Sequence, residues 1–468
     1  MPYVLGAHTN LVFSLSSILV NSLDQTFSCC SPSSSPSMGF TISYSLKYCP
    51  SSFRSFSNKP RSVEIFCCLS LEQSNHKITT KPTSINGGDS ESNSLRVVFA
   101  AGGTGGHISP AVAIADELKF IEPTTQILFM GTRNSMESAA VPSAGYNFLP
   151  VPAVKLFRPF FSPRNLLLPY NLIVSTLQCY RELQDFDPHI VVGTGGYVSF
   201  SICLAAAIKG AKVVIQEQNS VPGIANWVLS FFADMVFVAF NSTVDSFWGR
   251  HKCVVCGNPV RLSLRKYISK AVARLKFFPN SVRDEEAKVI LVLGGSLGAN
   301  AVNIALLNLY YQMLLDHQNW FIIWQTGVQA YDEMESLVKI RPRLLLKPFF
   351  HSMDSAYAAA DLIVSRAGAM TCSEILATGK PAILIPSADV AEGHQVRNAT
   401  LMADVAGSRV IFEDELDSTT LGTAIEEILR DEAVVAEMSE RALKAAKPEA
   451  AAEIVRHILS LVKLPKNK

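Results

Sequence analysis

The sequence has almost no excess of charge of either sign. It holds 41 Lys and Arg against 40 Asp and Glu, which gives a formal net charge of +1. A protein held on nucleic acid by many phosphate contacts carries a basic excess, so nucleic acid is not expected as a partner. The sequence also lacks a run of about 20 apolar residues without charge or glycine, which argues against a membrane-spanning helix. Residues 221–240 are interrupted by Pro222, Gly223 and Asp234.

Cysteine is present, but without a pairing pattern. The ten cysteines are scattered, which does not suggest a disulfide framework and indicates a reducing compartment. Cys253 and Cys256 form a C-x-x-C motif, yet no second pair follows and His251 is the one nearby residue of a metal-binding type. We therefore expect no metal site.

Two nucleotide-binding fingerprints are also missing. After Gly103-Thr104-Gly105, a dinucleotide motif needs a third glycine where Ile108 stands, and the strand at 126–130 is not followed by a carboxylate for a ribose. No glycine loop ends in Gly-Lys-Ser/Thr, which excludes a P-loop. An oxidoreductase is disfavoured on the same grounds.

The stretch from Leu95 to Leu118 organises the rest of the chain. An apolar, β-branched run is followed by four glycines at 102–106 and then by apolar residues at helical spacing after Pro110. A helix that begins at a glycine loop presents unpaired N–H groups and a positive dipole end, which suits an anion or a polar sugar. His107 at this loop is either a loop-stabilising hydrogen-bonding group or a general base.

Residues 1–90 resemble a targeting segment. They are dense in serine, and before Glu64 Asp24 is the one acidic residue among several basic ones. This composition is typical of plastid or mitochondrial transit peptides, and the lack of a strongly Arg-rich amphipathic helix favours the plastid. A disordered tail is the alternative.

Regular alternation of strands and helices predicts parallel sheets covered by helices on both faces. We expect an N-terminal domain over 91–262, a linker over 263–287 and a second domain over 288–468. The expected strands are Arg96–Ala100, Gln126–Met130, Ile190–Val192, Lys212–Gln216 and Met235–Ala239, then Lys288–Gly295, Trp320–Gln325, Leu362–Ser365 and Ala382–Ile385. The fold class is α/β, with two doubly wound, Rossmann-like domains facing each other across a cleft.

The segment from Lys155 to Leu168 interleaves apolar and basic residues. It is either ordinary core with a solvated arginine or a patch that rests on an anionic membrane surface.

Polar residues follow several strands at the edge where open α/β sheets bind ligands. In the second domain, helix starts at Ser296 and at Met370-Thr371 suit a nucleotide diphosphate, and Glu374 lies one turn into the second helix. His394 and Gln395 follow a later strand, where an amide can bind sugar hydroxyls. Plain helix capping and a favourable charge at a helix start are the alternatives.

Seven motifs occur together in one order: GGTGGHISPAVAIADEL (102–118), GTGGYVS (193–199), EQN (217–219), GNPVR (257–261), GGSLGA (294–299), RAGAMTCSE (366–374) and HQVRNA (394–399). In order and spacing they resemble the MurG family, the UDP-N-acetylglucosamine:N-acetylmuramyl-(pentapeptide) pyrophosphoryl-undecaprenol N-acetylglucosaminyltransferases of peptidoglycan synthesis. The resemblance covers about Leu95 to Leu461. With the transit-like extension, it suggests a plastid version.

The resemblance implies a GT-B glycosyltransferase that inverts the anomeric carbon and needs no metal or cofactor. UDP-N-acetylglucosamine would bind the second domain, and a polyprenyl-pyrophosphate-linked acceptor would reach the first domain from a membrane surface. His107 would deprotonate the acceptor 4-hydroxyl, and Glu374 would bind the ribose. The other implied substrate contacts are Thr104, Gly105, Gly106 and Tyr197 in the first domain, Arg261, Ser296, Ala369, Met370 and Thr371 at the diphosphate, the backbone near Phe350 at the uracil, and Asn219, His394 and Gln395 at the sugar.

The chain departs from the family pattern at four places. Leu297 stands where the family has Gln, Gln216 where it has His, and Ser201 where it has Pro, and the acceptor loop is the bulkier LFRPFFSP at 156–163. A plastid glycosyltransferase acting on another lipid, such as a galactolipid synthase, and a non-catalytic UDP-sugar-binding protein therefore remain open. A UDP-sugar epimerase shares the layout, but the sequence places no acid/base carboxylates for it.

Overall fold

The computed structural model describes residues 94–156, 162–279, 286–339, 342–350, 352–387 and 393–462. All described residues belong to one compact unit. The proposed targeting segment at 1–90 and most of the variant acceptor loop, residues 157–161, lie outside the described residues.

A seven-stranded parallel sheet forms the first half of this unit, with the strand order β3-β2-β1-β4-β5-β6-β7. The strands β1 and β4 lie side by side near the centre of the sheet. From β1 the chain continues outward to β2 and β3, then crosses back to β4 and continues outward on the other side to β5, β6 and β7. Its strands are β1 (Arg96–Ala100), β2 (Gln126–Gly131), β3 (Asn147–Pro150), β4 (Ile190–Gly193), β5 (Lys212–Glu217), β6 (Met235–Val238) and β7 (Cys253–Val255).

Helices cover both faces of this sheet because its strands are apolar on both faces. Val97 and Phe99 of β1 pack with one helical layer, and Val98 and Ala100 pack with the other. The first layer contains α1 (Gly105–Ile121) and α2 (Met136–Ser143), and the second contains α3 (Leu168–Phe186), α4 (Gly196–Lys209) and α5 (Ile224–Leu229). The short α6 (Asn241–Val244) follows β6.

The second half repeats this plan with a six-stranded parallel sheet in the order β10-β9-β8-β11-β12-β13. Its strands are β8 (Lys288–Leu293), β9 (Trp320–Gln325), β10 (Leu344–Lys347), β11 (Leu362–Ser365), β12 (Ala382–Leu384) and β13 (Arg409–Val410). Its helices are α9 (Asn300–Asp316), α10 (Tyr331–Leu337), α11 (Met353–Ala359), α12 (Ala369–Thr378), α13 (His394–Ala406), α14 (Ser418–Arg430) and α15 (Glu432–Ala445).

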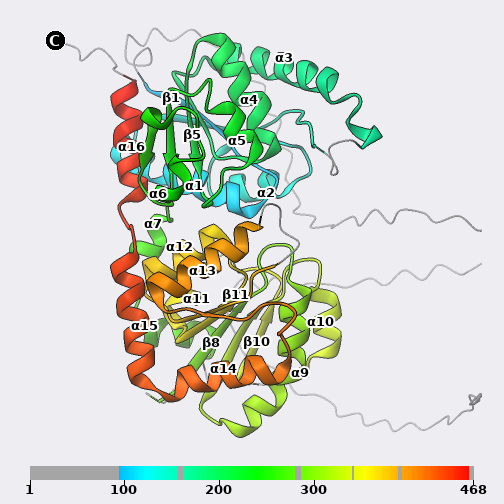
Figure 1. The fold of residues 1–468 in the computed structure, drawn as a ribbon, viewed down its shortest axis with the longest axis vertical. Coiled ribbons are helices and arrows are strands. Elements are labelled where there is room, and N and C mark those ends of the chain that lie inside the picture. Colours follow the sequence, from blue (N-terminus) through cyan, green and yellow to red (C-terminus); the bar gives the residue numbers. More distant parts are fainter. Residues whose placement is uncertain are drawn as a thin grey trace, which may run out of the picture. The chain divides into compact units, whose positions relative to one another are not determined.

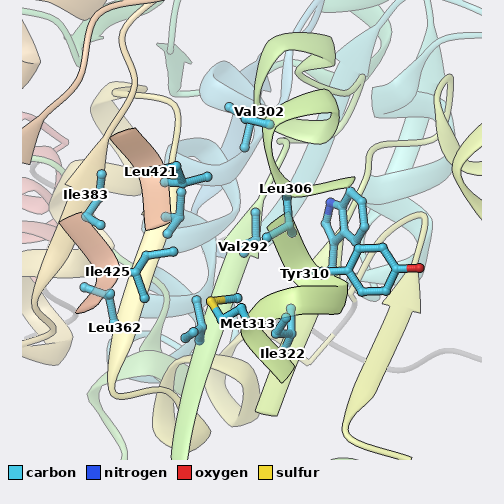
Figure 2. Close-up of a cluster of buried hydrophobic side chains, with 14 of the residues drawn as sticks. Val292, Val302, Leu306, Tyr310, Met313, Ile322, Leu362, Ile383, Leu421 and Ile425 are labelled. Carbon is cyan, nitrogen blue, oxygen red and sulfur yellow. The ribbon is translucent and has the colours of Figure 1, made fainter. Parts of the chain in front are cut away.

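The core of the second half also alternates along its central strand. Val292 of β8 packs with Leu306 and Tyr310 of α9 and with Ile425 of α14, as Figure 2 shows. Leu291 of β8 packs on the opposite face with Tyr357 of α11. The fold class expected from the sequence, two doubly wound parallel sheets, is confirmed (Figure 1).

Two regions differ from the sequence-based expectation. The presumed linker at 263–287 contains most of α7 (Leu262–Arg265) and all of α8 (Lys270–Phe277), and its Ala273 is buried in the second core. The last helix, α16 (Ala450–Leu461), was assigned to the second domain by its place in the sequence. Its apolar residues Ile454, Val455 and Ile458 instead pack in the first core, next to α1.

Within the described residues, no helix has the length and hydropathy needed to cross a bilayer. The five cysteines of that part of the chain are free thiols. Cys253 and Cys256 lie on and just after β7, and burial raises the pKa of Cys256 to about 12.

Candidate functional site

The first glycine loop connects the carboxyl end of β1 to α1. Thr104 is the N-cap residue in extended conformation, and Gly105 and Gly106 form the first helical turn. N–H groups at such a turn have no carbonyl partner within the helix and are available to a ligand. Gly103 has a φ of +89°, and a Cβ there would lie 3.0 Å from the Tyr197 ring, so glycine is required.

Glu137 of α2 holds this loop in place through hydrogen bonds. The sequence alone did not point to this residue. It is fully buried, and its carboxylate accepts hydrogen bonds from Gly103 N (3.2 Å), Thr132 N (3.1 Å) and Thr132 Oγ1 (2.5 Å). Burial acts to raise the pKa of Glu137, and these hydrogen bonds outweigh it, so the pKa lies below the ordinary value. Glu137 is therefore a charged support for the loop.

The imidazole of His107 is held by two acceptors on the same nitrogen. Nδ1 lies 3.0 Å from Thr194 O and 3.2 Å from Gln218 Oε1. Because both partners are oxygen acceptors, Nδ1 carries the proton in the neutral ring and Nε2 keeps its lone pair. Thr194 Oγ1 also donates to His107 O at 2.7 Å, which fixes the backbone of the same turn.

The surroundings of His107 favour its neutral form. Burial lowers its pKa most strongly and nearby His394 lowers it further, while Glu217, Gln218 and Thr194 raise it, and the pKa remains below the ordinary value of 6.5. The imidazole is then unprotonated at neutral pH, with an accepting Nε2. That is the state a general base requires.

The loop after β5 is organised by the buried carboxylate of Glu217. It accepts from Asn219 N (3.0 Å), Asn219 Nδ2 (3.1 Å), Gly223 N (3.0 Å) and Asn226 Nδ2 (2.8 Å). The amide nitrogen of Asn219 is thus held by Glu217. The side-chain oxygen of Asn219 and its second N–H are the groups left for a substrate hydroxyl.

The second half contributes a helix start that matches the first. Gly368 is the N-cap residue of α12, so Ala369, Met370 and Thr371 form its first turn and present their N–H groups. In the loop after β8, Ser296 Oγ lies 3.4 Å from the position that a Cβ on Gly105 would take. The glycine loops of the two sheets therefore meet. Leu297, where the family has Gln, is 51% exposed.

Glu374 lies on α12, with one carboxylate oxygen already bonded. Tyr357 Oη donates to Glu374 Oε2 at 2.9 Å. Burial raises the pKa of Glu374 to about 7, although the Tyr357 hydrogen bond and the positive charge of Arg261 lower it. The carboxylate is therefore only partly ionised at neutral pH before a ligand binds.

The structure refines the expectations for Phe350 and Gln395. The Phe350 N–H donates to Gln325 Oε1 at 3.1 Å, which leaves its carbonyl as the backbone group for a base edge. Gln325 Nε2 in turn donates to Gly295 O in the loop after β8. Gln325, which the sequence did not indicate, therefore links the backbone at Phe350 to that loop. Gln395 Oε1 accepts from Ser387 N at 2.9 Å, and its amide nitrogen is the group left for a sugar.

The remaining expected residues lie at the start of their helices. His394 begins α13 and is 9% exposed, and its field acts on His107. Arg261 is the N-cap residue of α7, and its positive charge acts on Glu374 and on Asp116 of α1. The structure thus brings residues of both halves near one another.

Sequence models of glycosyltransferase family 28 match both halves of the chain: the N-terminal domain model matches residues 97–238 and the C-terminal domain model matches residues 289–454. A relative from Salinibacter ruber is 39% identical over 365 residues, covering 78% of this chain and 96% of the relative. It is named UDP-N-acetylglucosamine--N-acetylmuramyl-(pentapeptide) pyrophosphoryl-undecaprenol N-acetylglucosamine transferase, as is a Flavobacterium psychrophilum relative at 38% identity, which covers 80% of this chain and 99% of that protein. The chain belongs to glycosyltransferase family 28, and within it to the MurG family.

Solved structures agree with this assignment. The crystal structure of Acinetobacter baumannii MurG superposes with a TM-score of 0.58 at 27% identity, covering 78% of this chain and 99% of that one. A Staphylococcus aureus MnaA structure with UDP has a TM-score of 0.57 at 14% identity, which shows a shared fold alone. The GT-B architecture expected from the sequence is therefore confirmed, and the chain is a glycosyltransferase of this family.

Four large apolar side chains are exposed on α3 and just before it. Leu166, Tyr170, Ile173 and Leu177 are exposed by 83%, 66%, 61% and 58%. We call these four residues the α3 face. These four side chains are therefore not part of the core, and Phe157, Phe160 and Phe161 of the 155–168 segment lie outside the described residues.

Proposed function

We propose that this protein transfers N-acetylglucosamine from UDP-N-acetylglucosamine to the 4-hydroxyl of the N-acetylmuramyl unit of a polyprenyl-pyrophosphate-linked acceptor. The observation that carries the proposal is His107, whose Nε2 is kept unprotonated by two acceptors on Nδ1. The names of the relatives at 38–39% identity support the substrates.

The proposed reaction is a single inverting displacement. His107 Nε2 takes the proton of the acceptor hydroxyl while that oxygen bonds to the anomeric carbon of the sugar. The bond from this carbon to the diphosphate oxygen breaks, and UDP leaves with the electron pair. The first turn of α12 and the loop around Ser296 face the developing negative charge with N–H donors and a positive helix end.

In this proposal Glu374 and the Phe350 carbonyl bind the nucleoside. Glu374 accepts the ribose hydroxyls through the carboxylate oxygen that Tyr357 does not occupy. Asn219, His394 and Gln395 bind the sugar, Tyr197 borders the acceptor loop, and Arg261 adds positive charge.

The experiment is acceptor-dependent UDP release by the full-length protein with a short-chain lipid I analogue. His107→Ala is expected to lower kcat by about 10²- to 10⁴-fold, because a positioned base is lost. Its affinity for UDP stays unchanged, since His107 is not a nucleotide contact. His251→Ala is the matched control, because His251 is exposed on the surface after Trp248. UDP binding without turnover in the wild type would instead support a non-catalytic binding protein, and turnover only with a diacylglycerol acceptor would support the galactolipid-type alternative.

We also propose that the α3 face rests on an anionic membrane, where the lipid-linked acceptor resides. Lys155, before α3 in the chain, and Arg181, one turn after Leu177 on α3, are exposed and positively charged. Apolar side chains combined with basic ones at a membrane surface favour anionic lipids. Ile173→Asp should reduce co-sedimentation with phosphatidylglycerol vesicles, whereas Ile304→Asp, a similarly exposed isoleucine on α9, should not. Equal loss in both variants would refute this membrane surface.

The cellular location follows from residues 1–90 alone. We propose that this serine-rich, acid-poor segment directs the protein to the plastid, with the mitochondrion as the alternative. Import of the radiolabelled full-length chain into isolated chloroplasts and mitochondria tests this. Processing and protease protection only in mitochondria, or in neither organelle, would contradict it.

A further inference from the structure

A chain of hydrogen bonds through four uncharged side chains connects His107 to α12, the helix whose first turn is proposed to bind the donor diphosphate. Gln216 and Gln218 lie at the end of β5, Asn258 follows β7, and Ser373 lies on α12. Gln216, Gln218 and Asn258 are 0%, 2% and 5% exposed, so their amides depend on one another for hydrogen bonds.

The orientation of the first amide is fixed by a backbone carbonyl. Thr194 O lies 3.0 Å from His107 Nδ1 and 2.7 Å from Gln218 Nε2, and a carbonyl oxygen can only accept. Both nitrogens must therefore carry protons toward it. Gln218 then presents Oε1 to His107 Nδ1–H at 3.2 Å, and its Nε2 also donates to Gln216 Oε1 at 2.5 Å.

A second backbone carbonyl fixes the other end. Asn258 Nδ2 donates to Gln218 O at 3.0 Å, so Asn258 Oδ1 is the atom that accepts from Gln216 Nε2, also at 3.0 Å. Asn258 Nδ2 donates in addition to Ser373 Oγ at 3.0 Å. Ser373 Oγ in turn donates to Ala369 O in the first turn of α12 at 2.9 Å.

The five bonds that link His107 to Ala369 through these side chains point the same way. The direction of donation runs from His107 through Gln218, Gln216, Asn258 and Ser373 to the backbone of Ala369. Hydrogen bonds arranged head to tail polarise one another and strengthen by about 10–30% each in a buried site. The Asn258–Ser373 bond is the step that joins the two halves of the chain.

We propose that Gln218, Gln216, Asn258 and Ser373 form a relay of positioning residues that, together with Thr194 O, holds the Nδ1–H tautomer of His107 and couples it to the donor-binding turn of α12. The inference rests on the proposed role of His107 as the base, and it deepens that proposal. When a diphosphate shifts or polarises the first turn of α12, the change reaches the base through these bonds. The relay thereby makes the hydrogen bonding of His107 depend on whether the donor is bound.

The first test does not depend on turnover. The full-length protein labelled with ¹⁵N-histidine is titrated by NMR, with His107→Asn for assignment. The charged or titratable groups acting on His107 are Glu217 and His394, and both stay intact. We expect the Nδ1–H tautomer in the wild type, and a lower His107 pKa in Gln218→Met and Gln216→Met, because the hydrogen bond to Gln218 raises that pKa.

Two further variants separate the relay from simple packing. Gln216→His should restore the wild-type titration, because a neutral imidazole also has one donor and one acceptor nitrogen. Ser373→Ala should shift the His107 resonance although it lies in the other half of the chain. Gln318→Met, at an exposed glutamine, is the control. An Nε2–H tautomer, or a titration that Gln216→Met leaves unchanged while the variant is folded by circular dichroism, overturns the proposal.

Kinetics with UDP-N-acetylglucosamine and a lipid I analogue give the second test. Gln216→Met should lower kcat about tenfold, the scale of one net hydrogen bond, with the KM for the donor within about twofold. The double variant Gln216→Met/Ser373→Ala should be no slower than the slower single variant, because either change interrupts the same chain. If the fold-losses in kcat of the two single variants multiply in the double variant, the two changes act independently, and this contradicts the relay. If the NMR expectations hold in a protein without turnover, the relay stands and the proposed function fails.

Discussion

The carboxyl group of Glu374 allows a prediction in which stability and binding change in opposite directions. Burial raises its pKa to about 7 from an ordinary value of 4.5. Between these two pH values the unfolded chain loses a proton that the folded chain keeps, so stability falls as pH rises from 4.5 to about 7. At 1.36 kcal/mol per pH unit, the ionised group costs about 3 kcal/mol above pH 7.

Glu374→Gln removes this charge and keeps an oxygen that Tyr357 can donate to. We expect the variant to be more stable than the wild type by up to about 3 kcal/mol near pH 8. The two proteins should be equally stable near or below pH 4.5, where the wild-type group is protonated in both states. The affinity for UDP should instead fall about tenfold, since charge-assisted bonds to the ribose become neutral ones.

The assay is urea unfolding of both proteins across the pH range, with UDP titrations by calorimetry near pH 8. Glu440→Gln, at an exposed position of α15, is the control for removing a carboxylate. A stability difference that does not vary with pH, or a variant less stable than the wild type near pH 8, would show that Glu374 is not held in a charge-disfavouring site. Unchanged UDP affinity would refute its role at the ribose.

Three further outcomes follow from the loops and the α3 face. Gly195→Ala should lower kcat at least tenfold in the UDP-release assay, because Gly195 has a φ of +97° and a Cβ would lie 3.0 Å from the His107 ring; activity within twofold of the wild type would contradict the required loop geometry. Glu137→Gln should lower the free energy of unfolding by about 1–3 kcal/mol near pH 7, because three donors lose their charged acceptor, and the difference should shrink below pH 4.5 as the wild-type carboxylate is protonated; thermal or urea unfolding checks it, and a pH-independent difference would argue against a charged Glu137. Ile173→Asp should reduce vesicle binding with UDP affinity unchanged, and a parallel loss of both would indicate misfolding rather than a membrane surface.

The sequence predicted those elements whose structure is determined by the residue pattern of a single segment. Apolar runs such as Val97–Ala100 are buried on both faces, so they could be recognised as parallel strands without knowing their neighbours. Glycine clusters at 102–106 and 294–298 marked the turns at which helices begin. His107 stood out because a titratable ring follows such a cluster.

The elements that were missed depend on long-range contacts. The strands β3, β7, β10 and β13 are the edge strands of the two sheets, only two to four residues long and mostly half-buried, which is too short for a residue pattern to distinguish them from loops. The last helix α16 packs on α1, more than 300 residues earlier in the chain, and no local pattern indicates which core an amphipathic helix joins. Sequence order alone placed it in the wrong half.

The supporting residues of the site were missed for the same reason. Glu137, Gln218 and Asn258 act through hydrogen bonds to residues from 34 to 115 positions away. Taken singly, an amide or a carboxylate in a helix or loop is usually solvated, and nothing in the local sequence shows that these are buried. For Gln218 and Asn258 the available signals were the EQN and GNPVR motifs and their position after the carboxyl ends of β5 and β7, where α/β sheets bind ligands. Glu137, inside α2, had neither signal.

The linkage and configuration of the product distinguish inverting transfer by His107 from every alternative. The full-length protein is incubated with UDP-N-acetylglucosamine and a short-chain lipid I analogue, and the product is examined by mass spectrometry and by the anomeric proton coupling in NMR. We expect addition of one N-acetylglucosamine in β configuration at the 4-hydroxyl, and its loss in His107→Ala. An α-linked product, a different attachment site, or equal activity in His107→Ala would contradict inverting transfer by this base.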